Sequence, residues 1–236
     1  MSRSVVVLAP QVYRIPTLGD FINSFAFVEG DGRVTLVDCG LKRAPARIVT
    51  GLAQIGKRPA DVTRIILTHA HLDHAGGAHA MVGATGADGV AIHEADAPFI
   101  REGVAPPTDT SITSGRLFSR LPASTFAASP VGEELHDQQL LDVAGGLRVV
   151  HTPGHTPGHV SLLHEPTGVL ITGDAIFNMA SRMRWPIAAI CTSFRQNRQS
   201  AHALGELDFT LAAFTHGPEV RENARETVRG FLARKG

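Results

Sequence analysis

The residues best suited to chemistry lie in one short string, His69-Ala70-His71-Leu72-Asp73-His74, directly after an apolar segment at 64–67. His69 and His71 are two residues apart in an extended turn and can point to the same side. Asp73 and His74 begin a helix and face a second point nearby. Because neutral imidazole and carboxylate are ligands that suit zinc, this string predicts ligands for two metal ions.

Three later apolar segments also end at residues that can bind metal. The segment 147–150 leads to His155, the segment 169–172 to Asp174, and the segment 210–215 to His216. Polar groups gathered at strand ends around an apolar core form the kind of concave site in which α/β enzymes bind ligands. The predicted metal ligands are therefore His69, His71, Asp73, His74, His155, Asp174 and His216.

Short runs of Val, Ile and Leu predict strands, and patterns with a period of about 3.6 residues predict helices between them. We expect strands at 5–8, 25–28, 34–37, 64–68, 90–93, 147–150, 160–163, 169–172 and 210–215. We expect helices at 44–55, 74–81, 94–101, 193–204 and 219–233. Strands mixed with helices in this way favour a layered α/β fold.

A segment at 103–130, rich in Pro, Ser, Thr and Ala, separates two parts of the chain. In each part an apolar strand ends in a turn that contains histidine. We therefore expect a single domain over residues 1–236, built of two pseudo-repeated halves at roughly 1–110 and 131–236. The segment between them is expected to serve as a linker or as a lid.

Composition narrows the function further. The chain has 22 Lys and Arg against 22 Asp and Glu, and zero net charge disfavours nucleic acid as a partner. No apolar run approaches the roughly 20 residues that span a bilayer, and no secretory signal pattern is evident. The two cysteines, Cys39 and Cys191, do not suggest a disulfide framework. We expect a cytoplasmic protein that acts on a small molecule without membrane or nucleic acid; its oligomeric state, a homodimer included, stays open.

The order of these motifs resembles the metallo-beta-lactamase superfamily. The resemblance rests on the HxHxDH string, the TPGHT turn at 152–156, the GD pair at 173–174 and the HG pair at 216–217. It extends back to Asn23-Ser24-Phe25 and to Val37-Asp38-Cys39-Gly40. The resemblance implies a four-layer αββα sandwich of two mixed β-sheets with outer helices, with a dinuclear metal site along one edge.

The resemblance also implies a role for each ligand. One metal would be held by His69, His71 and His155, and the other by Asp73, His74 and His216. Asp174 would bridge the two metals. Asp38 would orient the ligand loop.

Departures from individual branches of the superfamily narrow the activity. Zinc β-lactamases have a cysteine among the ligands of the second metal and lack the bridging aspartate, whereas this chain has Asp73, His74 and Asp174. Flavodiiron proteins carry a glutamate at the place of His71. The lactonases have a tyrosine at the place of Phe177, and typical glyoxalase II enzymes add a helical C-terminal region that residues 217–236 are too short to supply.

These comparisons predict a dinuclear zinc hydrolase that cleaves a small thioester, ester or lactone with a metal-bridging hydroxide. Two Zn²⁺ per chain are expected, with Fe or Mn as alternative metals. Asp73 and Asp174 are the predicted catalytic residues, and the sequence does not choose which of them moves the proton.

Other interpretations stay open at this point. A persulfide dioxygenase with one iron shares the HxHxDH string, and a nuclease of the same superfamily is disfavoured by zero net charge. Residues 177–186, which combine aromatic, Met and Arg side chains, are either a wall of the substrate pocket or a solvated loop. His151 and His159 are interpreted as residues of the turn or as supports of the ligands.

Overall fold

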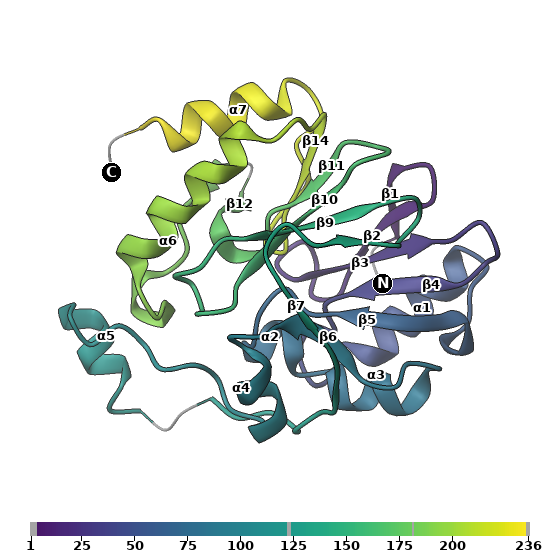
Figure 1. Ribbon diagram of the computed structural model, residues 1–236, viewed down its shortest axis with the longest axis horizontal. Helices are drawn as coiled ribbons and strands as arrows, with labels where there is room; N and C mark the ends of the chain where they lie inside the picture. The colour runs from purple at the N-terminus through teal and green to yellow at the C-terminus, as the bar shows by residue number, and fades with distance from the viewer. Residues whose placement is uncertain (1–3, 122–123, 181, 235–236) are drawn as a thin grey trace.

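Two β-sheets face each other in the computed structural model, which describes residues 4–121, 124–180 and 182–234 (Figure 1). The larger sheet follows the order of the chain, and its strands are β1 (Val6–Ala9), β2 (Val12–Pro16), β3 (Asn23–Val28), β4 (Val34–Val37), β5 (Val62–Ile66), β6 (Val90–His93) and β7 (Val131–Leu135). Strands β1 to β4 pair antiparallel and strands β4 to β7 pair parallel. This sheet is therefore mixed.

The smaller sheet comes from the second half of the chain. Its strands, in spatial order, are β14 (Leu211–Ala213), β11 (Val169–Ile171), β10 (Val160–His164), β9 (Leu147–His151) and β8 (Leu140–Leu141). Strands β11 and β14 pair parallel, and the other neighbours pair antiparallel. A separate hairpin is formed by β12 (Phe177–Met179) and β13 (Arg182–Arg184).

Helices cover the outer faces of both sheets (Figure 1). The α-helices are α1 (Pro45–Gln54), α2 (Leu72–Ala75), α3 (Ala78–Ala84), α4 (Ala97–Glu102), α5 (Thr113–Phe118), α6 (Phe194–Ser200) and α7 (Ala224–Leu232). Short 3-10 helices are η1 (Pro59–Asp61), η2 (Gly173–Ala175), η3 (Ala188–Ile190) and η4 (Ala201–Glu206).

Alternation along the strands divides the core into layers. In β3, Phe25 and Phe27 pack between the sheets, whereas Ala26 and Val28 face the layer that contains Ile48 of α1. A third cluster joins the outer face of the smaller sheet to η4 and α7. Two sheets back to back with helices outside confirm the predicted αββα sandwich.

The predicted strands and most predicted helices are present with shifts of a few residues at their ends. The helix predicted at 74–81 is wrong as a single element, because α2 and α3 are separated at Gly76 and Gly77. A Cβ atom on Gly77 would lie 2.3 Å from the carbonyl oxygen of Cys39, so the chain passes that loop too closely for a side chain. Helix α5 was not expected within 103–130, and residues 122–123 of that segment lie outside the described residues.

Among residues 4–121, 124–180 and 182–234, no helix combines the length and hydrophobicity that crossing a bilayer requires.

Candidate metal centre

Four loops that leave strand ends meet at one edge of the sandwich. The loop after β5 carries His69 and His71 and continues into α2, which holds Asp73 and His74. The loops after β9, β11 and β14 carry His155, Asp174 and His216. The structure brings all seven predicted residues together, because their ligand atoms form three groups in which the atoms lie within 4.8 Å of one another.

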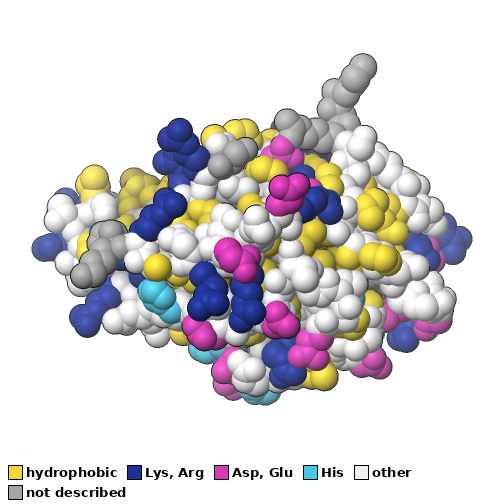
Figure 2. Space-filling model, turned by 90° about the horizontal axis from the view of Figure 1, so that it is seen from above, with side chains coloured by type: hydrophobic (Ala, Val, Ile, Leu, Met, Phe, Trp, Pro, Cys, Tyr) yellow, Lys and Arg dark blue, Asp and Glu magenta, His cyan; other side chains and the backbone are white. Residues whose placement is uncertain are grey.

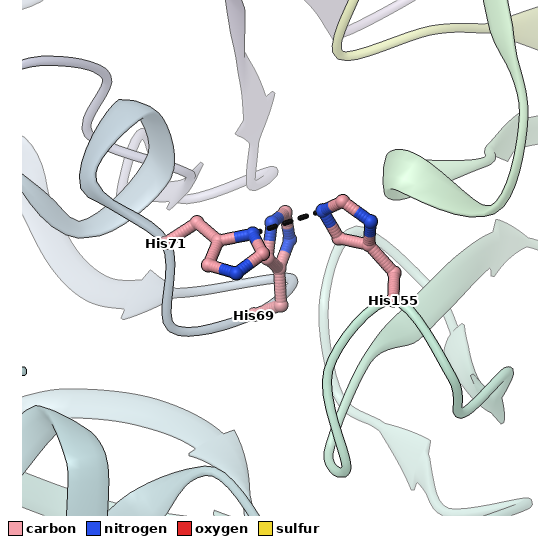
Figure 3. Close-up of side chains that lie close together, drawn as sticks. All are labelled: His69, His71 and His155. Carbon is pink, nitrogen blue, oxygen red and sulfur yellow. Dashed lines mark hydrogen bonds between the residues drawn. The ribbon is translucent and has the colours of Figure 1, made fainter. Parts of the chain in front are cut away.

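The first group consists of His69, His71 and His155 (Figure 3). His71 Nδ1 lies 2.9 Å from His155 Nε2, and the two rings meet at 87°. The ring of His69 stands edge-on to both of the others. Three imidazoles thus converge from two loops that are far apart in the sequence.

The second group consists of Asp73, His74 and His216. Asp73 Oδ2 lies 3.3 Å from His216 Nε2 and 3.8 Å from His74 Nε2. The opposite nitrogen of His216, Nδ1, bonds the carbonyl oxygen of Phe21, and this bond directs Nε2 toward the group. A second set of donors suited to a cation is therefore complete.

Asp174 lies between these two groups and forms the third group with His69 and His74. Its Oδ2 is 3.2 Å from His155 Nε2 and 3.2 Å from His216 Nε2, and its Oδ1 is 3.4 Å from His74 Nε2. The hydroxyl of Thr215 donates to Oδ1 at 2.7 Å. Contact with members of both groups is the position that a bridging carboxylate requires.

Two buried nitrogens test whether a metal fits here. His69 Nε2 and His74 Nε2 have no hydrogen-bond partner among the described residues. Leaving such a nitrogen unpaired costs about 1–3 kcal/mol. Since both atoms face the carboxylate of Asp174, a cation beside it would take up both lone pairs, and the donor set of imidazole and carboxylate suits a divalent transition metal.

The electrostatics of the groups differ. Burial lowers the pKa of His69 and lowers the pKa of His71 to about 3, so both imidazoles are neutral. Burial also opposes the charged form of His216, but the carboxylates of Asp174 and Asp73 outweigh it and raise its pKa to about 10. The pKa of Asp174 is held well below its usual range against the effect of burial, chiefly by His216. Metal binding at the second group must therefore displace a proton from His216.

Asp38 supports the ligand loop from beneath. Its carboxylate accepts hydrogen bonds from the backbone N–H of Thr68 at 2.8 Å and from the Thr68 hydroxyl at 2.8 Å. It also pairs with Nδ1 of His74 at 2.8 Å, which leaves Nε2 directed at the cluster. These contacts are those expected of a residue that orients the loop and fixes the tautomer of a ligand.

Replacing Asp38 with Asn tests this support. Asn keeps the shape of the side chain and tolerates the positive φ of 60° at this position, but it removes the charge beside His74. We expect the affinity for a divalent metal and kcat/KM to fall by about 10- to 100-fold. Competition with a chromophoric chelator measures the affinity, and a value within about twofold of the parent protein would contradict this role.

Asp96 is a supporting residue that the sequence did not reveal. Its buried carboxylate accepts from Ala70 N at 2.9 Å, from Thr156 Oγ1 at 2.7 Å and from Gly158 N at 2.6 Å. It therefore ties the loop of His69 and His71 to the loop of His155. Local sequence gave no signal for this, because Asp96 falls inside a predicted helix at 94–101.

His159 and His151 lie in different surroundings. His159 Nε2 accepts a hydrogen bond from the backbone N–H of Asp174 at 2.7 Å, so it positions the backbone of that ligand. Gly173 allows this approach, because a Cβ atom there would lie 2.5 Å from His159 Nε2 and its φ is +54°. His151 stacks on His93 with ring centroids 4.0 Å apart and belongs to none of the three groups.

A cavity of about 680 Å³ opens beside His71 and Asp73. Its wall is formed largely by residues of the segment 105–124, together with Ile22, Leu41 and Ile190. Among the described residues at 177–186, none lines this cavity, but the ring of Phe177 lies 4.5 Å from that of His216. Trp185, which directly follows the β12–β13 hairpin, contacts Phe231 of α7 with ring centroids 4.8 Å apart.

Comparison with known proteins agrees with this geometry. The family model of the metallo-beta-lactamase superfamily matches residues 18–226. The chain is 27% identical to the probable metallo-hydrolase YybB of Bacillus subtilis (strain 168) over 209 residues, which cover 88% of this chain and 86% of that protein. It is 33% identical to an N-acyl homoserine lactonase of Bacillus sp. over 137 residues, or 56% of this chain and 45% of the lactonase.

A solved structure shows the same architecture. A metallo-beta-lactamase family protein from Thermus thermophilus superposes with a TM-score of 0.73 at 27% identity, covering 96% of this chain and 80% of that one. The matched family model, the αββα sandwich and the histidine and aspartate groups at its edge agree with one another. This chain belongs to the metallo-beta-lactamase superfamily.

Proposed function

We propose that this protein is a dinuclear zinc hydrolase that cleaves a small ester, thioester or lactone. The observation that carries the proposal is the arrangement of Asp174 between two complete ligand groups, each with three side chains. A single-iron dioxygenase needs fewer ligands, so the complete second group of Asp73, His74 and His216 favours two metals. Similarity to a probable metallo-hydrolase supports hydrolysis as the reaction class.

A small-molecule substrate is part of the proposal. Lys and Arg together equal Asp and Glu in number, and side chains of both signs are interspersed on the face drawn in Figure 2. A nucleic-acid partner requires a concentrated basic surface to neutralise phosphates. The balance of charge therefore speaks against a nuclease.

Hydrolysis adds water across the bond between the acyl carbon and the departing oxygen or sulfur, which takes up one proton. Two bound zinc ions would supply Lewis acidity and a water whose pKa is lowered toward about 7. The ligand side chains would hold the two zinc ions in place and orient them toward the substrate. Proton transfer to the leaving atom then needs a side chain at the cavity.

Asp73 is better placed for that transfer than Asp174. The Asp73 side chain is 33% exposed and lines the cavity. The Asp174 side chain is 2% exposed, and its Oδ1 already accepts a hydrogen bond from the hydroxyl of Thr215. A general acid or base must come within hydrogen-bond reach of the proton that it moves. We assign proton transfer to Asp73 and the bridging role to Asp174.

The proposal is tested with zinc-loaded protein and a panel of aryl esters, acyl thioesters and lactones. We expect turnover of at least one class, and a loss of more than about 100-fold in kcat/KM for His71→Ala, because removing a ligand exceeds the effect of removing its support. His202→Ala, a change at an exposed histidine on η4, is the matched control and should leave the rate unchanged. Equal rates for His71→Ala and the parent would refute the site.

A further inference from the structure

The size and lining of the cavity beside the metal centre indicate what kind of substrate it could hold. It holds about 680 Å³, and His71 and Asp73 are among the residues that line it. Volumes of about 300–1,000 Å³ are typical of sites for small organic ligands. A group attached to a carbonyl at the metal centre would extend into this space.

The walls of the cavity are mainly apolar. The apolar lining residues include Ile22, Leu41, Leu72, Pro106, Phe118 and Leu121. Among the described lining residues none is Lys or Arg, and Asp73 is the single carboxylate. An anionic group would therefore enter without a basic partner and beside a negative side chain, which is costly.

Two lining side chains remain unusually open to solvent. Phe118 is 43% exposed and Leu121 is 60% exposed, although both face the hollow. Helix α5, which ends at Phe118, stands at the margin of the sandwich (Figure 1). An apolar ligand would remove this surface from water, which is favourable in proportion to the area buried.

We infer that the site takes substrates with an uncharged, extended apolar acyl chain, and that Phe118 and Leu121 determine this specificity. The inference rests on the proposed hydrolase function. The acyl chain lies along Leu41, Leu72 and Phe118 while its carbonyl sits at the metal centre. Anionic conjugates are poor substrates. Esters, thioesters and lactones share this acyl chemistry, and separate arms of the test distinguish them.

A second hollow next to the cavity contains arginine side chains that could bind a carboxylate of the substrate. It shares Ile22 and Leu41 with the cavity and is lined on its other side by Arg43 and Arg47. Arg47 already donates to the carbonyl oxygen of Thr17. If the substrate ended in a carboxylate that reached this hollow, carboxylated esters would be favoured over neutral ones of equal length.

The test measures kcat/KM of the zinc-loaded protein for acetyl, butyryl, hexanoyl and octanoyl aryl esters, for the matching thioesters and for lactones that carry alkyl chains of increasing length on the carbon next to the ring carbonyl. We expect an increase of up to about fourfold for each methylene in at least one series. The adipoyl monoester, with a terminal carboxylate, should react at least about tenfold more slowly than the hexanoyl ester.

Variants assign the effect to the two side chains. Phe118→Ala should reduce the ratio of octanoyl to acetyl rates by roughly fivefold. Leu121→Arg should improve the adipoyl monoester relative to the hexanoyl ester, because it provides the missing cation. Leu117→Ala is the matched control, since Leu117 is 63% exposed on the same helix and does not line the cavity.

The possible results of this test distinguish a failure of the inferred acyl-chain specificity from a failure of the proposed hydrolase function. Rates that rise with chain length and fall with charge support the inference. Rates that are flat across chain length, or higher for the adipoyl monoester, overturn it while hydrolysis itself stands. If the zinc-loaded protein hydrolyses no ester, thioester or lactone of any length, the proposed function fails and the inference fails with it.

Discussion

Replacing Asp174 with Ala should abolish binding of at least one of the two proposed zinc ions and reduce kcat/KM by more than about 100-fold. Its Oδ2 is 3.2 Å from both His155 Nε2 and His216 Nε2, so the change removes a carboxylate that contacts both ligand groups. It also leaves the hydroxyl of Thr215 without its acceptor. Elemental analysis of the dialysed protein and steady-state kinetics measure the two effects.

Two further variants make this result specific. Asp174→Asn keeps the shape of the side chain and an oxygen for Thr215, so it separates the loss of charge from the loss of packing. Asp208→Ala is the control, because that side chain is 97% exposed and its pairing with Arg225 at 3.3 Å is worth at most about 1 kcal/mol. Full zinc content and activity in Asp174→Ala would exclude a bridging role for Asp174.

Removing metal should destabilise the folded protein markedly. The site holds two unpaired buried nitrogens, His69 Nε2 and His74 Nε2, next to the carboxylates of Asp73 and Asp174. Metal bound at about 100 times its dissociation constant stabilises the folded state by about 2.7 kcal/mol. For a chain of this size that corresponds to a rise in Tm of about 5–10 °C.

Differential scanning calorimetry with and without a chelator measures this shift. We expect a higher Tm with zinc for the parent protein and a much smaller difference for Asp174→Ala. A parent Tm that is the same with zinc and with chelator would mean that these side chains do not bind metal in the folded state. The control for nonspecific zinc effects is Asp208→Ala, which should respond as the parent does.

Apolar strands that end at histidines and aspartates predicted a layered α/β fold and the elements that present the site, whereas the αββα sandwich was implied by the resemblance to the superfamily. The seven candidate ligands come together because those strand ends lie at one edge of the sandwich. Their role as ligands stays a prediction that the metal experiments test.

Elements with an unusual composition escaped prediction for physical reasons. Strand β2 contains Arg14, a charged residue that does not suggest a buried strand. Arg14 is buried because it pairs inside the fold with Asp20 at 2.9 Å and with Glu219 at 3.1 Å. Strand β7 lies at the edge of its sheet and carries Glu133 and Glu134, so it lacks an apolar run. Neither pattern differs locally from a polar loop.

Contacts between distant segments were also out of reach. Asp96 joins two ligand loops by accepting hydrogen bonds from the backbone N–H groups of Ala70 and Gly158. The residues next to Asp96 in the sequence do not indicate these partners. The cavity wall comes largely from residues at 105–121 and from Ser124, whereas Met183 and Trp185 pack on the cluster beside α7. Spacing along the chain carries no information about which loop covers the site.

The most direct test of the metal centre is a crystal structure of the zinc-loaded protein with anomalous diffraction recorded at the zinc absorption edge. The account predicts two zinc peaks, one against His69, His71 and His155 and the other against Asp73, His74 and His216, with Asp174 touching both. A single peak, or peaks that leave His155, Asp174 or His216 without contact to metal, would contradict it.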